Sequence, residues 1–142
     1  MAGRISLVSC VKSKLKSPAP AQDLYVSTLF KSMKRYALEN TDGWFILSAE
    51  HGLLRPSQII APYERTLKTM PKRDRVEWAE RVQRQLLEVL PASATVVILA
   101  GEDYRGGLVP FLNKHGFIIE VPMKGLKFGP QLRWLKEHFR NG

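Results

Sequence analysis

Short apolar runs and longer amphipathic stretches alternate along this chain of 142 residues. Four of the apolar runs are too short for helices and end at turn-forming residues, so they predict buried strands. The predicted strands cover residues 4–10, 44–47, 95–100 and 117–121. The run at 95–100 is rich in β-branched residues and uninterrupted, and we expect it to be the central strand.

Apolar residues at helical spacing predict a helix after each strand. The predicted helices cover residues 27–39, 71–90 and 108–114, and a last helix opens at residues 129–130. Residues 15–22 contain two prolines and predict a surface loop. Residues 55–71 hold three prolines and scattered apolar residues, which predicts a long irregular segment of the kind that is often functional.

The order of elements is strand then helix, four times, without internal repeats. Right-handed crossovers join parallel strands, so this order favours an α/β fold of three layers. We expect a mainly parallel four-stranded sheet with helices on both faces. The length fits a single domain spanning residues 1–142.

Small, polar or ionisable residues follow each predicted strand. The carboxyl ends of parallel strands meet at one edge of a sheet, where open α/β proteins bind ligands. The four clusters are residues 9–14, 48–52, 101–105 and 123–127. The last of them contributes charge, including Lys127, and little else.

The first cluster contains Ser9, Cys10, Lys12 and Lys14. Small side chains, successive amides and two ammonium groups can cradle an anion such as phosphate. The turn lacks the glycines of a dinucleotide or Walker loop, so we expect no nucleotide cofactor. Cys10 is either a nucleophile activated by the lysines or a small core residue, and Lys12 is either a phosphate ligand or an ordinary solvated lysine.

The second cluster places Ser48 at a strand end and His51 directly before Gly52. A histidine at this position is exposed at the rim of the expected site, while the glycine lets the chain bend sharply away. His51 is a candidate acid, base or hydrogen-bond donor, with a structural histidine as the alternative. His115 and His138 lie in helical surface contexts and are interpreted as structural.

The third cluster contains Glu102, Asp103, Tyr104 and Arg105. Consecutive residues point in different directions, so at most one of the two carboxylates faces the site. The other is expected to cap the following helix. A carboxylate at the site could activate water or stabilise a positively charged sugar. Tyr104, like Tyr63, could stack on a base or could simply pack.

The chain has 22 Lys and Arg residues against 13 Asp and Glu residues, a net charge of +9. This charge favours polyanions, and nucleic acid in particular, as partners. The alternative is a positive surface that only confers solubility. No run approaches the ~20 apolar residues that span a membrane, and the first residues do not resemble a signal peptide, so we expect a cytoplasmic location. One cysteine and three separated histidines predict no metal site.

Several segments resemble a family of small bacterial and phage proteins of uncertain function. The segments that carry this resemblance are residues 7–14, 23–30, 47–54, 62–67 and 99–101. The family is similar, at greater distance, to YaaA-type peroxide-stress proteins and to an accessory domain of archaeal tRNA-guanine transglycosylases. A looser similarity to uracil-DNA-glycosylase-like folds implies a parallel sheet with the site at its strand ends. These resemblances imply nucleic acid or modified nucleobases as the target.

The leading hypothesis is an enzyme that acts on a nucleobase or its N-glycosidic bond in nucleic acid, similar to a DNA glycosylase. It would serve DNA repair or modified-base processing without a cofactor, with DNA favoured over RNA. In this hypothesis Ser9, Lys12 and Lys14 hold phosphate, while His51 and one of the two adjacent carboxylates perform the chemistry. Two alternatives stay open: a non-catalytic DNA- or RNA-binding module, and an enzyme of nucleosides or nucleotides. The oligomeric state is left open.

Overall fold

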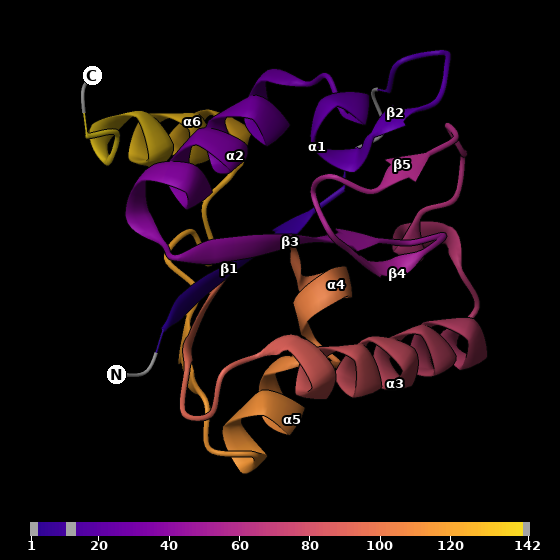
Figure 1. The fold of residues 1–142 in the computed structure, drawn as a ribbon, viewed down its shortest axis with the longest axis vertical. Helices are drawn as coiled ribbons and strands as arrows, with labels where there is room; N and C mark the ends of the chain where they lie inside the picture. The colour runs from indigo at the N-terminus through magenta and orange to yellow at the C-terminus, as the bar shows by residue number, and fades with distance from the viewer. Residues whose placement is uncertain (1–2, 11–13, 141–142) are drawn as a thin grey trace.

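A five-stranded sheet with the strand order β4-β3-β1-β6-β7 forms the centre of the computed structural model, which describes residues 3–10 and 14–140 (Figure 1). The strands are β1 (Arg4–Ser9), β3 (Gly43–Ser48), β4 (Gly52–Leu54), β6 (Thr95–Leu99) and β7 (Ile118–Glu120). The strands β3, β1, β6 and β7 are parallel, as predicted, and β4 runs antiparallel to β3.

The prediction of four strands is wrong because it lacked β4. This strand is three residues long and pairs with β3 through a hairpin, with Ser48 opposite Gly52 and Ile46 opposite Leu54. A run of three residues is too short to show a period of its own. The strand at the middle of the sheet is β1, whereas β6, which we expected there, lies beside it.

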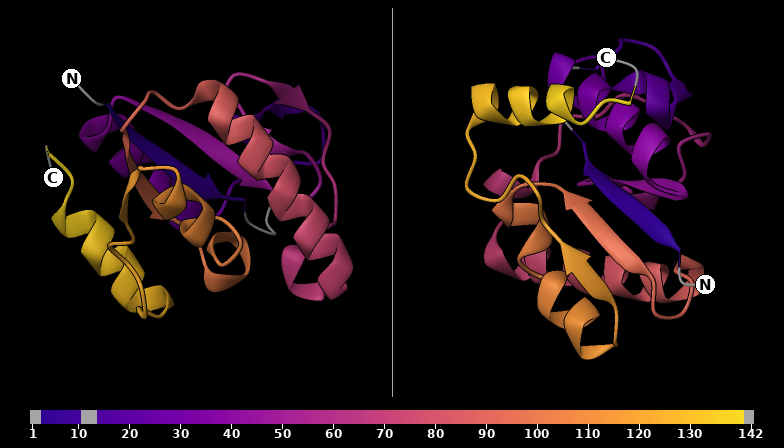
Figure 2. Two further views of the ribbon diagram at one scale, coloured as in Figure 1. Left: turned by 90° about the horizontal axis from the view of Figure 1, so that it is seen from below. Right: turned by 90° about the vertical axis from the view of Figure 1, so that its left-hand side faces the viewer.

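Helices cover both faces of the sheet, as predicted (Figures 1 and 2). The helices α2 (Thr28–Asn40) and α6 (Phe128–Glu137) lie on one face, and α3 (Lys72–Val89) and α5 (Val109–Lys114) lie on the other. The bounds predicted for α2, α3 and α5 and the start predicted for α6 are close to these. Three short helical segments, α1 (Ala21–Leu24), η1 (Leu67–Thr69) and α4 (Glu102–Arg105), complete the fold.

Two apolar cores separate at the sheet because side chains alternate along each strand. In β1, Leu7 belongs to the core under α3 and Val8 to the core under α2. The strand β6 divides in the same way, with Ile98 on the α3 side and Leu99 on the α2 side. A strand buried on both faces needs apolar residues at nearly every position, which explains the continuous runs in the sequence.

The two segments predicted as loops contain a small ribbon that pairs them. The strands β2 (Ala19–Pro20) and β5 (Ile59–Ile60) are antiparallel, and the Ala21 amide donates to the Gln58 carbonyl at 2.7 Å. The ribbon therefore joins residues 15–22 to residues 55–71, and it brings Tyr25 and Tyr63 next to each other beyond it.

The central position of β1 can be tested with Leu7→Ala. Leu7 is fully buried, so its truncation should lower the free energy of unfolding by about 2–5 kcal/mol. The control is Leu38→Ala on α2, where the side chain is 59% exposed and the change should stay within about 0.5 kcal/mol. Urea unfolding measures both, and equal losses would contradict the position given to β1.

Candidate functional site

The carboxyl ends of β3, β1 and β6 lie side by side, so the first three polar clusters meet at one edge of the sheet. The register pairs Ser9 with Leu47 and Val8 with Leu99. Cys10 follows β1 and stays attached to its neighbour, because its amide donates to the Leu47 carbonyl at 2.9 Å. This edge holds two features, a hydrogen-bonded group of tyrosines and a crevice.

The first feature, which we call the tyrosine cluster, consists of Tyr25, Tyr63 and Ser48. The hydroxyl groups of Tyr25 and Tyr63 are 2.6 Å apart, and Ser48 Oγ donates to Tyr63 Oη at 2.7 Å. The His51 amide donates in turn to Ser48 Oγ at 3.1 Å. This chain of hydrogen bonds ties the end of β3 to the segments on both sides of the small ribbon.

Lys14 and His51 both lie against Tyr63. Lys14 Nζ is 4.5 Å above the centre of the Tyr63 ring, and the His51 ring meets the same tyrosine edge to face at 5.5 Å. Burial lowers the pKa of Lys14, while the electron-rich ring face favours its ammonium form. The structure thus brings a predicted phosphate ligand and a predicted catalytic residue together. Lys14 covers a face of Tyr63 on which a base was expected to stack.

Cys10 and Tyr104 link the ends of β1 and β6. Cys10 Sγ is 3.2 Å from Tyr104 Oη, and the thiol is buried. The Trp78 ring from α3 meets Tyr104 edge to face at 5.6 Å, and its Nε1 donates to the Ser48 carbonyl at 2.8 Å. These contacts fit the interpretation of Cys10 as a small core residue, and its role as a nucleophile stays a prediction.

Burial keeps the tyrosines of this edge neutral. It raises the pKa of Tyr25 to about 12, and it raises the pKa values of Tyr63 and Tyr104 further above the ordinary range. All three side chains are phenols at neutral pH, as an ordinary tyrosine is, and burial extends the neutral form to higher pH. They can therefore donate and accept hydrogen bonds. None of them is an anionic base.

The second feature is a crevice of about 470 Å³ at the ends of β1 and β6. The chain leaves β1 toward β3 and leaves β6 toward β7, in opposite directions along the sheet. Such a reversal opens a crevice at the carboxyl ends, the usual ligand site of open α/β sheets. We call it the switch-point crevice. Its polar lining comprises Ser9, Glu102, Arg105 and Gln131, together with the backbone of Ala100 and Gly101.

Of the two adjacent carboxylates, Glu102 lines the switch-point crevice. Its Oε2 accepts from Arg105 Nη2 at 2.9 Å, and Arg105 Nη1 donates to the Ala100 carbonyl at 2.8 Å. Asp103 instead faces α3, where it lies 3.6 Å from Arg75. The prediction that the other carboxylate caps the following helix is wrong, because the N-cap of α5 is Leu108 and no described side chain makes a capping hydrogen bond there. Both carboxylates instead lie in the first turn of the short helix α4, whose N-cap is Gly101.

Other predicted site residues are less closely grouped. Lys12 lies outside the described residues. Lys127 is exposed and precedes α6, next to Leu126, which lines the crevice. His51 follows β3 and is not part of the crevice lining. His51 and Glu102, which we predicted to act together, therefore lie at different parts of this edge.

Three residues of α3 that the sequence analysis missed hold the turn around His51. Besides the bond from Trp78, Arg81 Nη2 donates to the Glu50 carbonyl at 3.1 Å, and Gln85 Oε1 accepts from the Leu53 amide at 3.0 Å. Positions 78, 81 and 85 lie on one face of a helix. Polar side chains on that otherwise apolar stripe were the available signal.

Within residues 3–10 and 14–140, no cluster of three or more His, Cys, Asp or Glu side chains is arranged to hold a metal ion. No helix in the described part of the chain has the length and apolar character needed to cross a membrane.

The fold and this edge define an open α/β protein with a candidate ligand site at the carboxyl ends of its parallel strands. Residues 5–137 match a family described as a family of unknown function (DUF6884). The chain is 31% identical over 123 residues to the uncharacterized protein YfjM of Bacillus subtilis (strain 168), with 81% of each chain covered. The chain belongs to this family of unknown function, DUF6884.

A second similar protein is named as an enzyme. The chain is 32% identical over 117 residues to an enoyl-acyl-carrier-protein reductase (NADH) of Burkholderia thailandensis. This match covers 82% of the chain but only 28% of the reductase. Most of that protein therefore has no counterpart here.

Gly52→Ala tests the turn that positions His51. Gly52 has a φ of +76°, and a Cβ there would lie 2.6 Å from Gln85 Oε1 and 3.0 Å from Arg81 Nε. The left-handed conformation alone costs a residue with a Cβ about 1–2 kcal/mol, so the variant should lose at least that much in urea unfolding. Gly129→Ala in α6 is the matched control, because open space surrounds its position and stability should not fall. Equal losses in the two variants would contradict the tight turn.

Alkaline stability tests the burial of Tyr25. Its folded pKa of about 12 exceeds the ordinary value of about 10, so its neutral form contributes stability that is complete below pH ~10. That contribution should be lost as the pH rises from about 10 through about 12, at a cost of about 2–3 kcal/mol. Urea unfolding across this range should show a shallower decline for Tyr25→Phe than for the unmodified protein. Parallel declines would contradict the burial.

Proposed function

We propose that this protein is a nucleic-acid-directed enzyme that acts on a nucleobase or its N-glycosidic bond, in DNA repair or modified-base processing. The observation that carries the proposal is the switch-point crevice with Glu102 and Arg105 at its rim. A base that is turned out of its strand needs a cavity beside groups that act on its glycosidic bond. The volume of about 470 Å³ lies in the range of small-ligand sites.

In this proposal Glu102 acts on the sugar. Its carboxylate takes a proton from a water molecule whose oxygen forms a bond to the sugar C1′. The glycosidic C–N bond breaks, and its electron pair leaves with the base, which then takes up a proton. The ion pair with Arg105, itself held by the Ala100 carbonyl, fixes the carboxylate at the rim.

Lys14 and His51 contact the nucleic acid beside the crevice in this proposal. Both lie on Tyr63, next to the end of β3, and both can donate a hydrogen bond to a phosphate. The net charge of +9 supports a polyanionic substrate. The predicted likeness to YaaA-type proteins and to an accessory domain of tRNA-guanine transglycosylases favours the same target. DNA as the preferred substrate and the cytoplasm as the location are parts of this proposal.

A non-catalytic nucleic-acid-binding module is the second candidate. The observation in its favour is that both carboxylates of α4 are exposed and engaged by arginines, Glu102 by Arg105 and Asp103 by Arg75. Such a module would bind with an affinity that falls steeply with salt and would release no base. Reductase activity is not proposed, because the sequence of residues 9–14 lacks the glycines that cradle a dinucleotide.

The adjacent carboxylates provide a matched test of catalysis. Oligonucleotides that carry uracil, hydroxymethyluracil or alkylated bases are incubated with the protein, and abasic sites are detected by alkaline cleavage. Glu102→Gln should slow base release by about 100-fold or more, the usual effect of losing an acid–base group. Asp103→Asn, one residue away on the same exposed helix, should leave the rate nearly unchanged.

The two candidate functions separate in this assay. No base release from any of these substrates, with salt-dependent binding retained, would reject the enzyme and support the binding module. Equal losses in the two variants would reject the role given to Glu102. His51→Gln should raise KM more than it lowers kcat, and His115→Gln at the C-cap of α5, whose ring contacts Phe111, serves as its control.

A further inference from the structure

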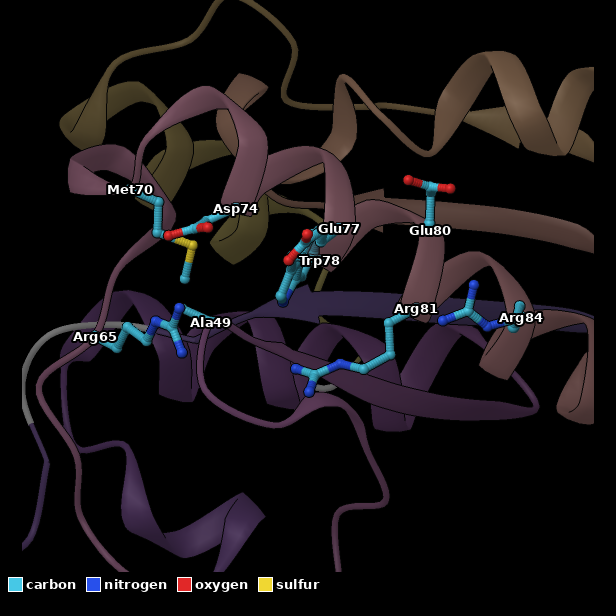
Figure 3. A pocket seen from close by; sticks show the side chains of 9 residues that line it. All are labelled: Ala49, Arg65, Met70, Asp74, Glu77, Trp78, Glu80, Arg81 and Arg84. Carbon is cyan, nitrogen blue, oxygen red and sulfur yellow. The ribbon is translucent and has the colours of Figure 1, made fainter.

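A second cavity, of about 520 Å³, lies between α3 and residues 49–70 (Figure 3). Its floor is apolar and consists of Ala49, Met70 and Trp78, while its walls carry both signs of charge. We call it the mixed-charge cavity. Its charged residues are three arginines and three acids, Arg65, Arg81, Arg84, Asp74, Glu77 and Glu80.

Five of these six charged residues are exposed, and Asp74 is partly buried. In the described part of the chain, none of the ion pairs joins two of the six. Arg81 has a backbone partner, the Glu50 carbonyl. Figure 3 shows the guanidinium groups of Arg65 and Arg81 extending toward each other from opposite walls, with Glu77 beside Trp78 between them. The three acids, Arg81 and Arg84 all lie on α3, and Arg65 faces them from the segment before the helix, so a ligand between the two walls can contact both signs of charge.

The two signs of charge restrict the chemistry of that ligand. A simple anion would meet three carboxylates, and a simple cation would meet three guanidinium groups. A ligand that suits both carries an anionic group together with N–H donors. A nucleotide has this combination, because guanidinium groups bind phosphate and carboxylates accept hydrogen bonds from the amino groups of bases.

The cavity borders the candidate site directly. Trp78, on the floor of the cavity, donates a hydrogen bond to the Ser48 carbonyl and packs on Tyr104. Arg81, on its wall, holds the turn that carries His51. The two cavities share no lining residue, but Tyr104, which packs on Trp78, stands between Glu102 and Arg105, two residues that line the switch-point crevice.

We propose that the mixed-charge cavity binds a second nucleotide of the nucleic-acid strand, with its phosphate between Arg65, Arg81 and Arg84 and its base donating to Glu77. The inference rests on the proposed function, since it takes the ligand to be part of the same strand. The cavity then serves to recognise the nucleotides that flank the target base.

Removal of single charges tests the phosphate contacts. Fluorescence anisotropy measures the affinity for labelled oligo-dC across a range of salt concentrations. Arg65→Gln and Arg84→Gln should each weaken binding several-fold and reduce the slope of log K against log salt by about one. Arg81 is kept because it also positions the His51 turn. Arg133→Gln is the control, an exposed arginine on α6, across the sheet from α3. It should change neither quantity appreciably, and equal effects of all three substitutions would overturn the proposal.

Base contact is tested with Glu77→Gln. Cytosine offers an exocyclic amino group to a carboxylate and thymine does not. The variant should therefore lose affinity for oligo-dC while its affinity for oligo-dT stays level or rises, because a negative charge near the strand has been removed. Glu137→Gln on α6 is the control. A similar gain on both oligonucleotides would show that Glu77 only repels the strand and would overturn the base contact.

Two further arms identify the source of the ligand and separate this inference from the proposed function. Cytidine monophosphate should compete only at much higher concentration than the oligonucleotide. Competition at similar concentration would overturn the assignment to a strand, and displacement by a mixed-charge peptide at lower concentration would overturn the nucleotide. These measurements report binding and need no catalysis. Their outcome is therefore independent of whether the protein releases a base.

Discussion

The burial of β1 on all sides is the constraint on which the rest of this structure depends. The strand has a parallel partner along each edge and a helical layer over each face. A polar side chain along it must find a partner inside the protein. Ser6 does so, with its hydroxyl donating to Thr41 Oγ1 at 3.1 Å. The other polar side chains of the strand lie at its two ends, Arg4 in an ion pair with Glu120 and Ser9 at the candidate site.

The same rule explains the tyrosine cluster. A buried hydroxyl without a partner would be costly. Tyr25 and Tyr63 satisfy each other, and Ser48 joins them to the turn of His51. The hydrogen bonds that make the cluster tolerable in the interior also position His51 at the surface. The same hydrogen bonds thus satisfy the buried hydroxyl groups and determine the geometry of the site.

How far the sequence predicts the structure depends on whether a feature is local. The buried runs at 44–47 and 95–100 and the amphipathic helix at 71–90 were predictable, because a repeating pattern within one segment determines them. The strand β4 and the ribbon of β2 and β5 were not, since each depends on pairing between segments too short to show a period.

Prediction of the candidate site is limited in the same way, to features that a pattern within one segment determines. The convergence of Ser9, Ser48 and Gly101 follows from parallel strands and was expected. Which of Glu102 and Asp103 lines the crevice depends on where Arg75 and Arg105 lie. The hydrogen bonds from α3 to the turn around His51 likewise depend on contacts between two segments. No pattern within a single segment reports such contacts.

The reversal of the chain at β4 separates the parallel sheet from the segment that lies over its carboxyl edge. Without it, the chain could pass from β3 directly into α3; with it, the chain makes a detour over the carboxyl edge before the helix begins. Tyr63 and Arg65 lie on this detour, and buried Leu67 anchors its far end. The detour behaves as an insert in an ordinary strand–helix unit. Substitutions at its exposed positions, such as Arg65, therefore leave the packing of the parallel sheet underneath unchanged.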